Sequence, residues 1–303
     1  MGQAMFGKWL LLAAVALSAC APMETTPTVT QKSFPTIKAA CGERDGWSDP
    51  APPAHVFANV YMVGTCGIVS LLITTPDGHF LIDGATDEAA EGIADNIRKL
   101  GFDPKDVVYL LITHEHLDHA GGIAKLKQIT GGHIAIRKPA WVAMQTGLPV
   151  ADDPQHGIHP AFPGIGNEVV IVIEDGNVME LGKQTIKIIA TPGHSPGGSS
   201  YTWKSCEGKT CRSFVYADSL NAVSAETYRF TNHPAYVATL RASMAKIEAI
   251  KDCDIMISPH PFQSDFFDRL AGEKPLVEAD RCKQYVSAAR ARLDTRLATE
   301  ATE

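Results

Sequence analysis

The sequence has no cluster of basic residues and no long hydrophobic run, and both absences narrow its function. Its 303 residues include 27 Lys and Arg against 34 Asp and Glu, which gives a net charge of −7. Without a basic patch, a nucleic-acid partner is not expected. The apolar run at residues 9–17 is shorter than the roughly 20 residues that span a bilayer. No internal repeat is present, and the length fits one large globular domain or two small ones.

The N-terminal residues are typical of an export signal and a linker rather than of a folded domain. A short apolar run closed by small residues predicts a secretory signal over residues 1–20. The stretch that ends at Cys20 also resembles a bacterial lipobox, which implies a lipidated Cys20, a membrane tether and a periplasmic location. An ordinary signal cleaved nearby, for instance after Ala21, is the alternative. Residues 21–38, with repeated Thr and Pro, predict a flexible tether, so residues 39–303 form the folded domain.

The cysteines also favour export. There are seven, and six remain once Cys20 is set aside; six cysteines allow fifteen pairings. Two of the six flank four residues and predict a pinched hairpin tip, and two others lie at the end of a helix and within the last helix. The expected disulfides are therefore Cys206 with Cys211, Cys253 with Cys282, and Cys41 with Cys66. Disulfides persist in oxidising compartments; reduced thiols are the alternative.

Three histidines and one aspartate crowd into six residues of the chain. These side chains are His114, His116, Asp118 and His119. The segment follows residues 107–112, which predict a buried strand, and precedes residues 123–129, which predict a helix. Ligands gather where strands end in α/β proteins. Imidazole and carboxylate groups together suit zinc, so a metal site is expected here.

Asp83 is a further polar residue at the end of an apolar strand, where an acid is unfavourable unless it has a partner. It either has such a partner or caps the next helix, and the sequence leaves both open. Strands of a second sheet are expected at residues 169–173, 186–190, 199–203 and 214–217.

Two more histidines follow apolar strands. His194 lies in a turn rich in Pro and Gly, and His260 lies between two prolines. Flanking prolines lower the entropy that is lost when a ligand is fixed, although each histidine alone could be an ordinary turn residue. Residues 146–167 show no periodicity, and loops of that length are usually functional or disordered. Gln155 in this loop is therefore a candidate for lining a substrate cleft.

The run Thr-His-Glu-His-Leu-Asp-His at residues 113–119 resembles the His-x-His-x-Asp-His signature of the metallo-β-lactamase fold superfamily. The resemblance covers residues 41–297, and it includes a first motif at Asp83, which implies that this acid supports the metal loop. It implies an α/β fold in which two β-sheets pack face to face with helices outside, and a hydrolase with two zinc ions per chain. The resemblance assigns two sets of zinc ligands, the first being His114, His116 and His194 and the second being Asp118, His119 and His260.

This ligand set resembles the third subclass of metallo-β-lactamases, because no cysteine is placed to bind the second zinc as in the first subclass. Residues 216–220, Tyr-Ala-Asp-Ser-Leu, extend the resemblance. They imply that Ser219 and Asn221 meet the substrate carboxylate, although that subclass often has Ser or Thr in place of Asn221.

The resemblance implies that a metal-bound hydroxide, oriented by Asp118, opens the β-lactam amide bond of penicillins, cephalosporins and carbapenems. The expected result is antibiotic resistance, with a β-lactam as partner and a monomeric protein. The alternative is a glyoxalase-II-like thioesterase or a lactonase, in which Asp218 would bridge the two zinc ions. A non-catalytic zinc-binding lipoprotein is a third reading, against which the complete set of six ligands argues.

Overall fold

A seven-stranded mixed sheet forms one half of the fold. The computed structural model describes Met1 and residues 36–302, so the expected signal peptide, Cys20 and nearly all of the expected tether lie outside the described residues. Strands β1 to β4 form an antiparallel meander, and β4 to β7 run parallel. They follow one another across the sheet in chain order: β1 (Ala54–Phe57), β2 (Val60–Met62), β3 (Leu71–Thr75), β4 (Gly78–Ile82), β5 (Val107–Leu111), β6 (His133–Arg137) and β7 (Ile171–Ile173).

A five-stranded sheet forms the other half. Its order is β12-β11-β10-β9-β8, and only β12 joins its neighbour in parallel. Its strands are β8 (Val178–Leu181), β9 (Gln184–Ala190), β10 (Ser199–Glu207), β11 (Thr210–Tyr216) and β12 (Ile255–Ile257). The expectation that residues 169–173 belong to this sheet is wrong, because β7 pairs with β6 at Ala135↔Ile171 and extends the first sheet. A three-residue strand of β-branched residues carries no sequence signal for which sheet it joins.

The main hydrophobic core lies between the two sheets. Along β9 the buried Ile186 and Ile188 alternate with the exposed Thr185 and Lys187, as expected for a strand with one face in a core. Aromatic side chains fill the space between the sheets, among them Phe80, Tyr201, Trp203 and Phe214. The observed architecture therefore confirms the expected α/β sandwich with two sheets face to face.

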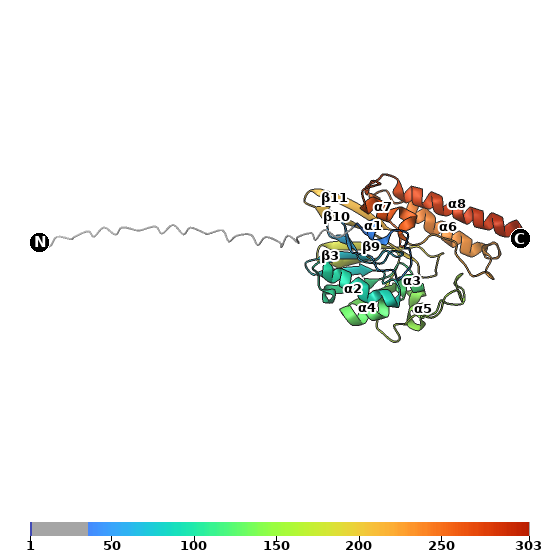
Figure 1. Cartoon of the computed structure of the whole chain (residues 1–303), viewed down its shortest axis with the longest axis horizontal. Coiled ribbons are helices and arrows are strands. Elements are labelled where there is room, and N and C mark those ends of the chain that lie inside the picture. The colour runs from blue at the N-terminus through green and yellow to red at the C-terminus, as the bar shows by residue number, and fades with distance from the viewer. Residues whose placement is uncertain (2–35, 303) are drawn as a thin grey trace. The chain divides into compact units, whose positions relative to one another are not determined.

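Helices cover the outer faces of both sheets. Figure 1 shows α2 and α4 on one side of the strands and α6 and α8 on the other. Ile93 and Ile97 of α2 pack with Leu110 of β5, whereas Met244 of α6 and Leu293 of α8 belong to a separate cluster on the second sheet. The α-helices are α1 (Ile37–Cys41), α2 (Ala90–Lys99), α3 (Leu117–Ala120), α4 (Ile123–Thr130), α5 (Trp141–Thr146), α6 (Pro234–Glu248), α7 (Phe266–Leu270) and α8 (Arg281–Thr302). The 3₁₀ turns are η1 (Asp87–Ala89), η2 (Pro104–Asp106), η3 (Lys138–Ala140), η4 (Phe230–Asn232) and η5 (Pro261–Ser264).

The folded domain begins slightly earlier than the sequence indicated. The side chain of Thr36 accepts a hydrogen bond from the backbone of Ala39 and so caps α1, and Ile37 is only 2% exposed. Residues 37–38 therefore belong to the domain and not to a tether, because Ile37 packs into the core between the sheets.

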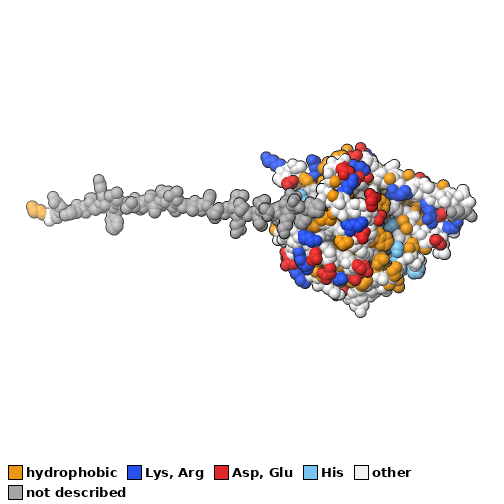
Figure 2. Space-filling view, viewed as in Figure 1, with side chains coloured by type: hydrophobic (Ala, Val, Ile, Leu, Met, Phe, Trp, Pro, Cys, Tyr) orange, Lys and Arg blue, Asp and Glu red, His pale blue; other side chains and the backbone are white. Residues whose placement is uncertain are grey.

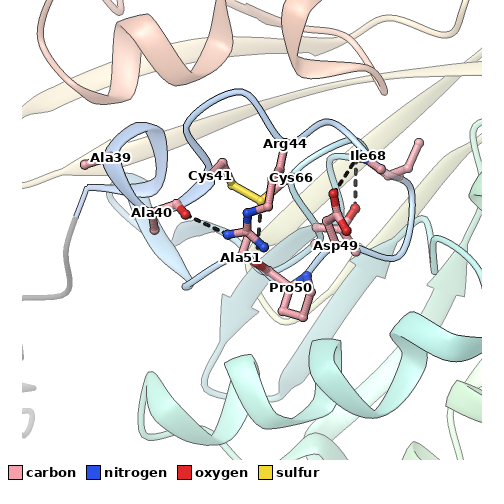
Figure 3. Close-up of a disulfide and its surroundings, with 12 residues drawn as sticks. Ala39, Ala40, Cys41, Arg44, Asp49, Pro50, Ala51, Cys66 and Ile68 are labelled. Carbon is pink, nitrogen blue, oxygen red and sulfur yellow. Dashed lines mark hydrogen bonds between the residues drawn. A yellow bond between two sulfur atoms is a disulfide. The ribbon is translucent and has the colours of Figure 1, made fainter.

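The structure forms all three expected disulfides: Cys41–Cys66, Cys206–Cys211 and Cys253–Cys282. Figure 3 shows the first, which joins α1 to the segment before β3. In the same region Arg44 donates a hydrogen bond to the carbonyl of Ala40 at 2.6 Å, so the chain after α1 folds back onto it. The third disulfide ties α8 to the residues that lead into β12.

Charges of both signs are interspersed over the surface that Figure 2 shows, with no continuous basic area on that face. Among the residues that the structure describes, no helix combines the length and apolarity needed to cross a membrane.

Candidate metal centre

The candidate ligands come from three loops, each of which follows a strand. His114, His116, Asp118 and His119 lie in the loop after β5 and in α3, His194 follows β9, and His260 follows β12. Five of the six are buried, with exposed fractions between 0% and 6%, and His260 has a side chain 15% exposed. The sheets therefore bring together segments that lie up to 146 residues apart in the sequence.

The first expected ligand set converges on one point. Ligand atoms of His114, His116 and His194 lie within 4.8 Å of one another. Their ring centroids are 4.7 to 5.0 Å apart and the rings meet edge to face. Nε2 of His114 is buried without a hydrogen-bond partner among the described residues. A buried nitrogen lone pair of this kind is unfavourable unless a ligand occupies the position in front of it.

The ligand atoms of the second expected set lie closer together than those of the first. Nε2 of His119 lies 3.2 Å from Oδ2 of Asp118, Nε2 of His260 lies 3.4 Å from the same oxygen, and the two nitrogens are 3.4 Å apart. Ligands of a tetrahedral zinc with bonds of about 2.0–2.1 Å are separated by about 3.3 Å. The three atoms therefore already stand at the spacing that a tetrahedral zinc requires. Ligand atoms of His114, Asp118 and His119 also lie within 4.8 Å of one another, so the two sets adjoin.

The outward-facing ring nitrogens are held by acceptors. Nδ1 of His114 pairs with Asp218 at 2.9 Å, Nε2 of His116 with Asp153 at 3.0 Å, and Nδ1 of His119 with Asp83 at 3.3 Å. Nδ1 of His194 donates to the backbone carbonyl of Asn221 at 2.9 Å. A proton held on the outer nitrogen leaves the inner nitrogen deprotonated, as metal-binding histidines require.

Asp83 has the supporting role that the sequence left open. Its carboxylate accepts hydrogen bonds from the backbone nitrogen of Thr113 at 2.6 Å, the hydroxyl of Thr113 at 2.8 Å and the hydroxyl of Tyr216 at 3.0 Å. The residue adopts a positive φ of 65°, a conformation that Asp tolerates better than most residues. Among the described residues, no side-chain hydrogen bond caps the N-terminus of η1 or α2, so Asp83 does not cap the following helix.

Burial sets the protonation of two of the ligands. Burial, with a contribution from His116, lowers the pKa of His194 to about 3, and burial together with His119 lowers the pKa of His260 to about 4. Burial alone would raise the pKa of Asp118, but the nearby His119 and His260 outweigh burial and hold the pKa of this carboxyl well below its usual range. At neutral pH these groups therefore present two neutral imidazoles and an anion, which is the state in which they bind a metal.

Glu115 joins two of the ligand loops. Its buried carboxylate accepts hydrogen bonds from the hydroxyl of Ser195 at 2.8 Å and from the backbone nitrogen of Gly197 at 2.7 Å. A Cβ at position 197 would lie 2.5 Å from the carboxylate, so the close approach requires glycine. The loop that carries His114 and His116 is thereby fixed to the loop that carries His194.

The structure places the three expected substrate residues differently from one another. Gln155 is 6% exposed, and its side-chain nitrogen lies 3.3 Å from both Nδ1 of His116 and Nε2 of His194. Ser219 is fully buried, and its hydroxyl has no hydrogen-bond partner within the described part of the chain. Asn221 accepts a hydrogen bond from Arg292 on its side-chain oxygen at 2.7 Å.

Sequence reasoning missed Asp153 and Glu115, and it considered Asp218 only as a metal bridge. Asp153 lies in the aperiodic loop, which offers no local signal for a contact with His116. Asp218 ends an apolar strand as Asp83 does, and that shared pattern could have marked it as a partner of the ligands.

Comparison with known proteins agrees with this geometry. Residues 63–207 match the model of the metallo-beta-lactamase superfamily. The solved metallo-β-lactamase MIM-1 from Novosphingobium pentaromativorans is 46% identical, with a TM-score of 0.84 over 88% of this chain and 98% of that one. MEM-A1, a subclass B3 metallo-β-lactamase from a soil metagenome library, is 38% identical, with a TM-score of 0.81 over 85% of this chain and 99% of its own.

A curated relative has a different activity. The N-acyl homoserine lactonase AttM of Agrobacterium fabrum is 34% identical over 160 residues, which is 43% of this chain. The match spans 57% of the length of that relative. Taken together with the fold and the converging ligand sets, these similarities show that the chain belongs to the metallo-β-lactamase superfamily. Its solved structural relatives include subclass B3 enzymes, as the sequence resemblance implied.

Proposed function

We propose that this protein hydrolyses the β-lactam amide bond of penicillins, cephalosporins and carbapenems with two zinc ions, and that it thereby confers antibiotic resistance. The observation that carries the proposal is the position of Asp218. Its Oδ1 pairs with the outer nitrogen of His114, so the carboxylate lies behind a ligand and not between the two ligand sets. The sets of three histidines, and of Asp118 with two histidines, are then complete without it.

The same position argues against the lactonase and thioesterase alternatives. In those enzymes an aspartate at the corresponding strand end is expected to bridge the two metals. Asp218 is fully buried, its backbone nitrogen bonds to the hydroxyl of Ser200 at 2.9 Å, and its Oδ1 also accepts from the nitrogen of Ser219 at 2.8 Å. Only Oδ2 lacks a hydrogen-bond partner among the described residues, so the carboxylate would have to release Nδ1 of His114 before both of its oxygens could bind metal ions.

Zinc would supply the nucleophile, since it lowers the pKa of a bound water from 15.7 to about 7. His114, His116 and His194 would hold one ion, and Asp118, His119 and His260 the other. Asp118 would also accept a hydrogen bond from the attacking water and so orient it toward the amide carbonyl. The buried acceptors behind the histidines keep their rings in place during the reaction, so no side chain has to reorganise.

The substrate would enter beside the aperiodic loop. Gln155 reaches the first ligand set from that loop, and its amide could donate a hydrogen bond to a bound substrate. Ser219 has an unused hydroxyl donor beside the centre. Both remain proposed substrate contacts, and the choice among β-lactams would depend on the shape of this loop.

We also propose that the protein is exported, lipidated on Cys20 and tethered to a membrane in the periplasm, where it would act as a monomer. Three disulfides support an oxidising compartment. The replacement Cys20→Ala should release the protein from the membrane fraction or block its maturation. A wild-type protein that is soluble and begins at residue 21 or 22 would contradict the lipid anchor.

A substrate panel tests the proposed activity. Purified protein is offered a carbapenem, a cephalosporin, an N-acyl homoserine lactone and a glutathione thioester, each with and without EDTA. Turnover of the two lactams that EDTA abolishes supports the proposal. Turnover of the lactone or the thioester alone assigns the protein to the alternative hydrolases, and no turnover at all assigns it to a binding function.

A further inference from the structure

The proposed substrates share a charge that the metal centre does not account for. Penicillins, cephalosporins and carbapenems all carry a carboxylate on the ring fused to the lactam. Ser219, one proposed contact, offers this carboxylate a single neutral hydroxyl, which is buried. A carboxylate that loses its hydration on binding is bound most strongly by a guanidinium, because a guanidinium offers two parallel N–H donors.

We propose that Arg292 is the residue that binds this carboxylate, an inference that rests on the proposed function. Arg292 lies on α8, far along the chain from every ligand. Its Nε donates to the side-chain oxygen of Asn221 at 2.7 Å, and the backbone carbonyl of Asn221 accepts from Nδ1 of His194 at 2.9 Å. Only Asn221 therefore separates the guanidinium from a metal ligand.

The contact with Asn221 holds the guanidinium through Nε and leaves its two terminal nitrogens able to donate to a ligand. Arg292 is exposed, and its two terminal nitrogens have no hydrogen bond or ion pair with any other described residue. The other arginines of α8 are engaged: Arg281 bonds to Gln284 and the carbonyl of Ser264, Arg290 pairs with Glu248, and Arg296 pairs with Glu300. Arg292 therefore differs from them in keeping its terminal donors open to a ligand.

The packing of α8 explains why Arg292 reaches this position. Tyr285 lies two turns earlier on the same helix, and seven residues return a side chain to nearly the same face. Its hydroxyl donates to the backbone carbonyl of Asp218 at 2.9 Å. One face of α8 is thus docked on residues 218–221, the segment after β11 that runs beside the ligands. The disulfide Cys253–Cys282 fixes the start of this helix.

The charge on this face is suited to an anion. The acidic side chains near the centre are already committed to histidines: Asp218 to His114, Asp153 to His116, and Asp118 to His119 and His260. None of them is paired with Arg292. An exposed arginine held by a neutral amide keeps its full charge for the substrate, and the charge also speeds the approach of an anion at low salt.

A comparison of acid and ester substrates tests this role. A chromogenic cephalosporin and its carboxylate methyl ester are offered to the zinc-loaded wild type and to Arg292→Gln, Arg292→Lys and Arg290→Gln. The wild type should prefer the acid by about ten-fold in kcat/KM, the range for one hydrogen-bonded charge pair that is partly exposed. The preference should fall to about two-fold or less in Arg292→Gln, mainly through KM, and recover in part in Arg292→Lys.

Arg290→Gln is the matched control, because it removes an equal charge from the same helix and should leave the preference unchanged. Zinc content is measured in every variant, so that a loss of metal is not mistaken for a loss of substrate binding. An unchanged preference in Arg292→Gln at equal zinc content would overturn the assignment.

The two proposals are separated by the wild-type result. Ring opening of the cephalosporin acid by the wild type tests the proposed function alone. If the wild type does not open the ring, calorimetric binding of the same acid and ester to the wild type and Arg292→Gln measures the preference directly. Arg292 is assigned if the preference for the acid depends on it, and the assignment fails if it does not.

Discussion

The replacement Asp83→Asn should weaken one of the two zinc sites selectively. Oδ1 of Asp83 accepts from the backbone nitrogen of Thr113 at 2.6 Å and has to remain an acceptor. The asparagine nitrogen therefore takes the position of Oδ2, which now accepts from the hydroxyls of Thr113 and Tyr216 and lies 3.3 Å from Nδ1 of His119. Asparagine tolerates the positive φ of 65° at this position, so the backbone has no reason to move.

The three donors respond differently to this exchange. The hydroxyl of Thr113 can rotate and accept, and the hydroxyl of Tyr216 can direct its single proton to the carbonyl of Val69 at 2.7 Å. Nδ1 of His119 has no such freedom. To accept from the new amide, the ring must move its proton to Nε2, and that removes the lone pair that would bind zinc.

The expected loss of zinc affinity follows from the role of an acceptor that lies behind a metal-binding histidine. Removing the acceptor behind a metal-binding histidine typically costs about 10- to 100-fold in metal affinity, which corresponds to about 1.4–2.7 kcal/mol. A hydrogen bond to a charged group contributes about 1.5–3 kcal/mol by an independent estimate. The two ranges agree, so we expect the weaker zinc of Asp83→Asn to bind about 10- to 100-fold less tightly.

Competition with a fluorescent chelator measures both dissociation constants in the wild type and the variant. Glu88→Gln is the control, because Glu88 is exposed and the exchange also replaces one carboxylate by an amide. A variant that binds its second zinc within three-fold of the wild type would refute the reasoning about His119. An equal loss at both sites would indicate a general unfolding instead of a tautomer effect.

Three further predictions concern stability and the second metal. Opening Cys253–Cys282 by double replacement with Ser should lower the free energy of unfolding by about 3–4 kcal/mol, since the residues are 29 apart in sequence; a denaturant titration that shows under 1 kcal/mol contradicts this. Burial would raise the pKa of Glu300, but hydrogen bonds from Arg296 and the backbone lower it from 4.5 to about 2. Glu300 therefore stabilises the fold above its unfolded pKa, and Glu300→Gln should flatten the loss of stability that acid melts of the wild type show as pH falls from about 5 to 2. Asp118→Asn should cut lactam turnover by orders of magnitude while leaving the fold intact, because it removes the charged ligand of the second zinc; near-normal turnover would show that this ligand is not needed.

The ligand loop itself was predictable because its information is local. Four candidate ligands between residues 114 and 119 follow a buried strand, and His194 and His260 repeat the pattern of a histidine at a strand exit. The pairing of Cys206 with Cys211 was equally local, since Cys206↔Cys211 are opposite one another at the tip of the β10–β11 hairpin.

Contacts between distant segments were not predictable in the same way. Asp153 meets His116 across 37 residues through the path of a loop without periodicity, and Arg292 meets Asn221 across 71 residues through the docking of α8. The sheet that β7 joins is likewise decided by its pairing with β6. Three β-branched residues predict a strand but do not predict its neighbour. Local pattern therefore identified the candidate metal ligands, whereas tertiary packing decided which groups support them and which residue contacts Asn221.

The central claim, that two adjoining ligand sets form a β-lactam-opening zinc centre, is tested most directly by a zinc titration. Metal-free protein is mixed with increasing zinc, and the opening of a carbapenem ring is followed by its absorbance. Six ligands in two sets predict that the rate rises until about two zinc ions are bound per chain and then stays constant, and that EDTA abolishes it. A full rate at one zinc per chain would contradict the two-metal centre, and no ring opening at any zinc concentration would contradict the proposed function.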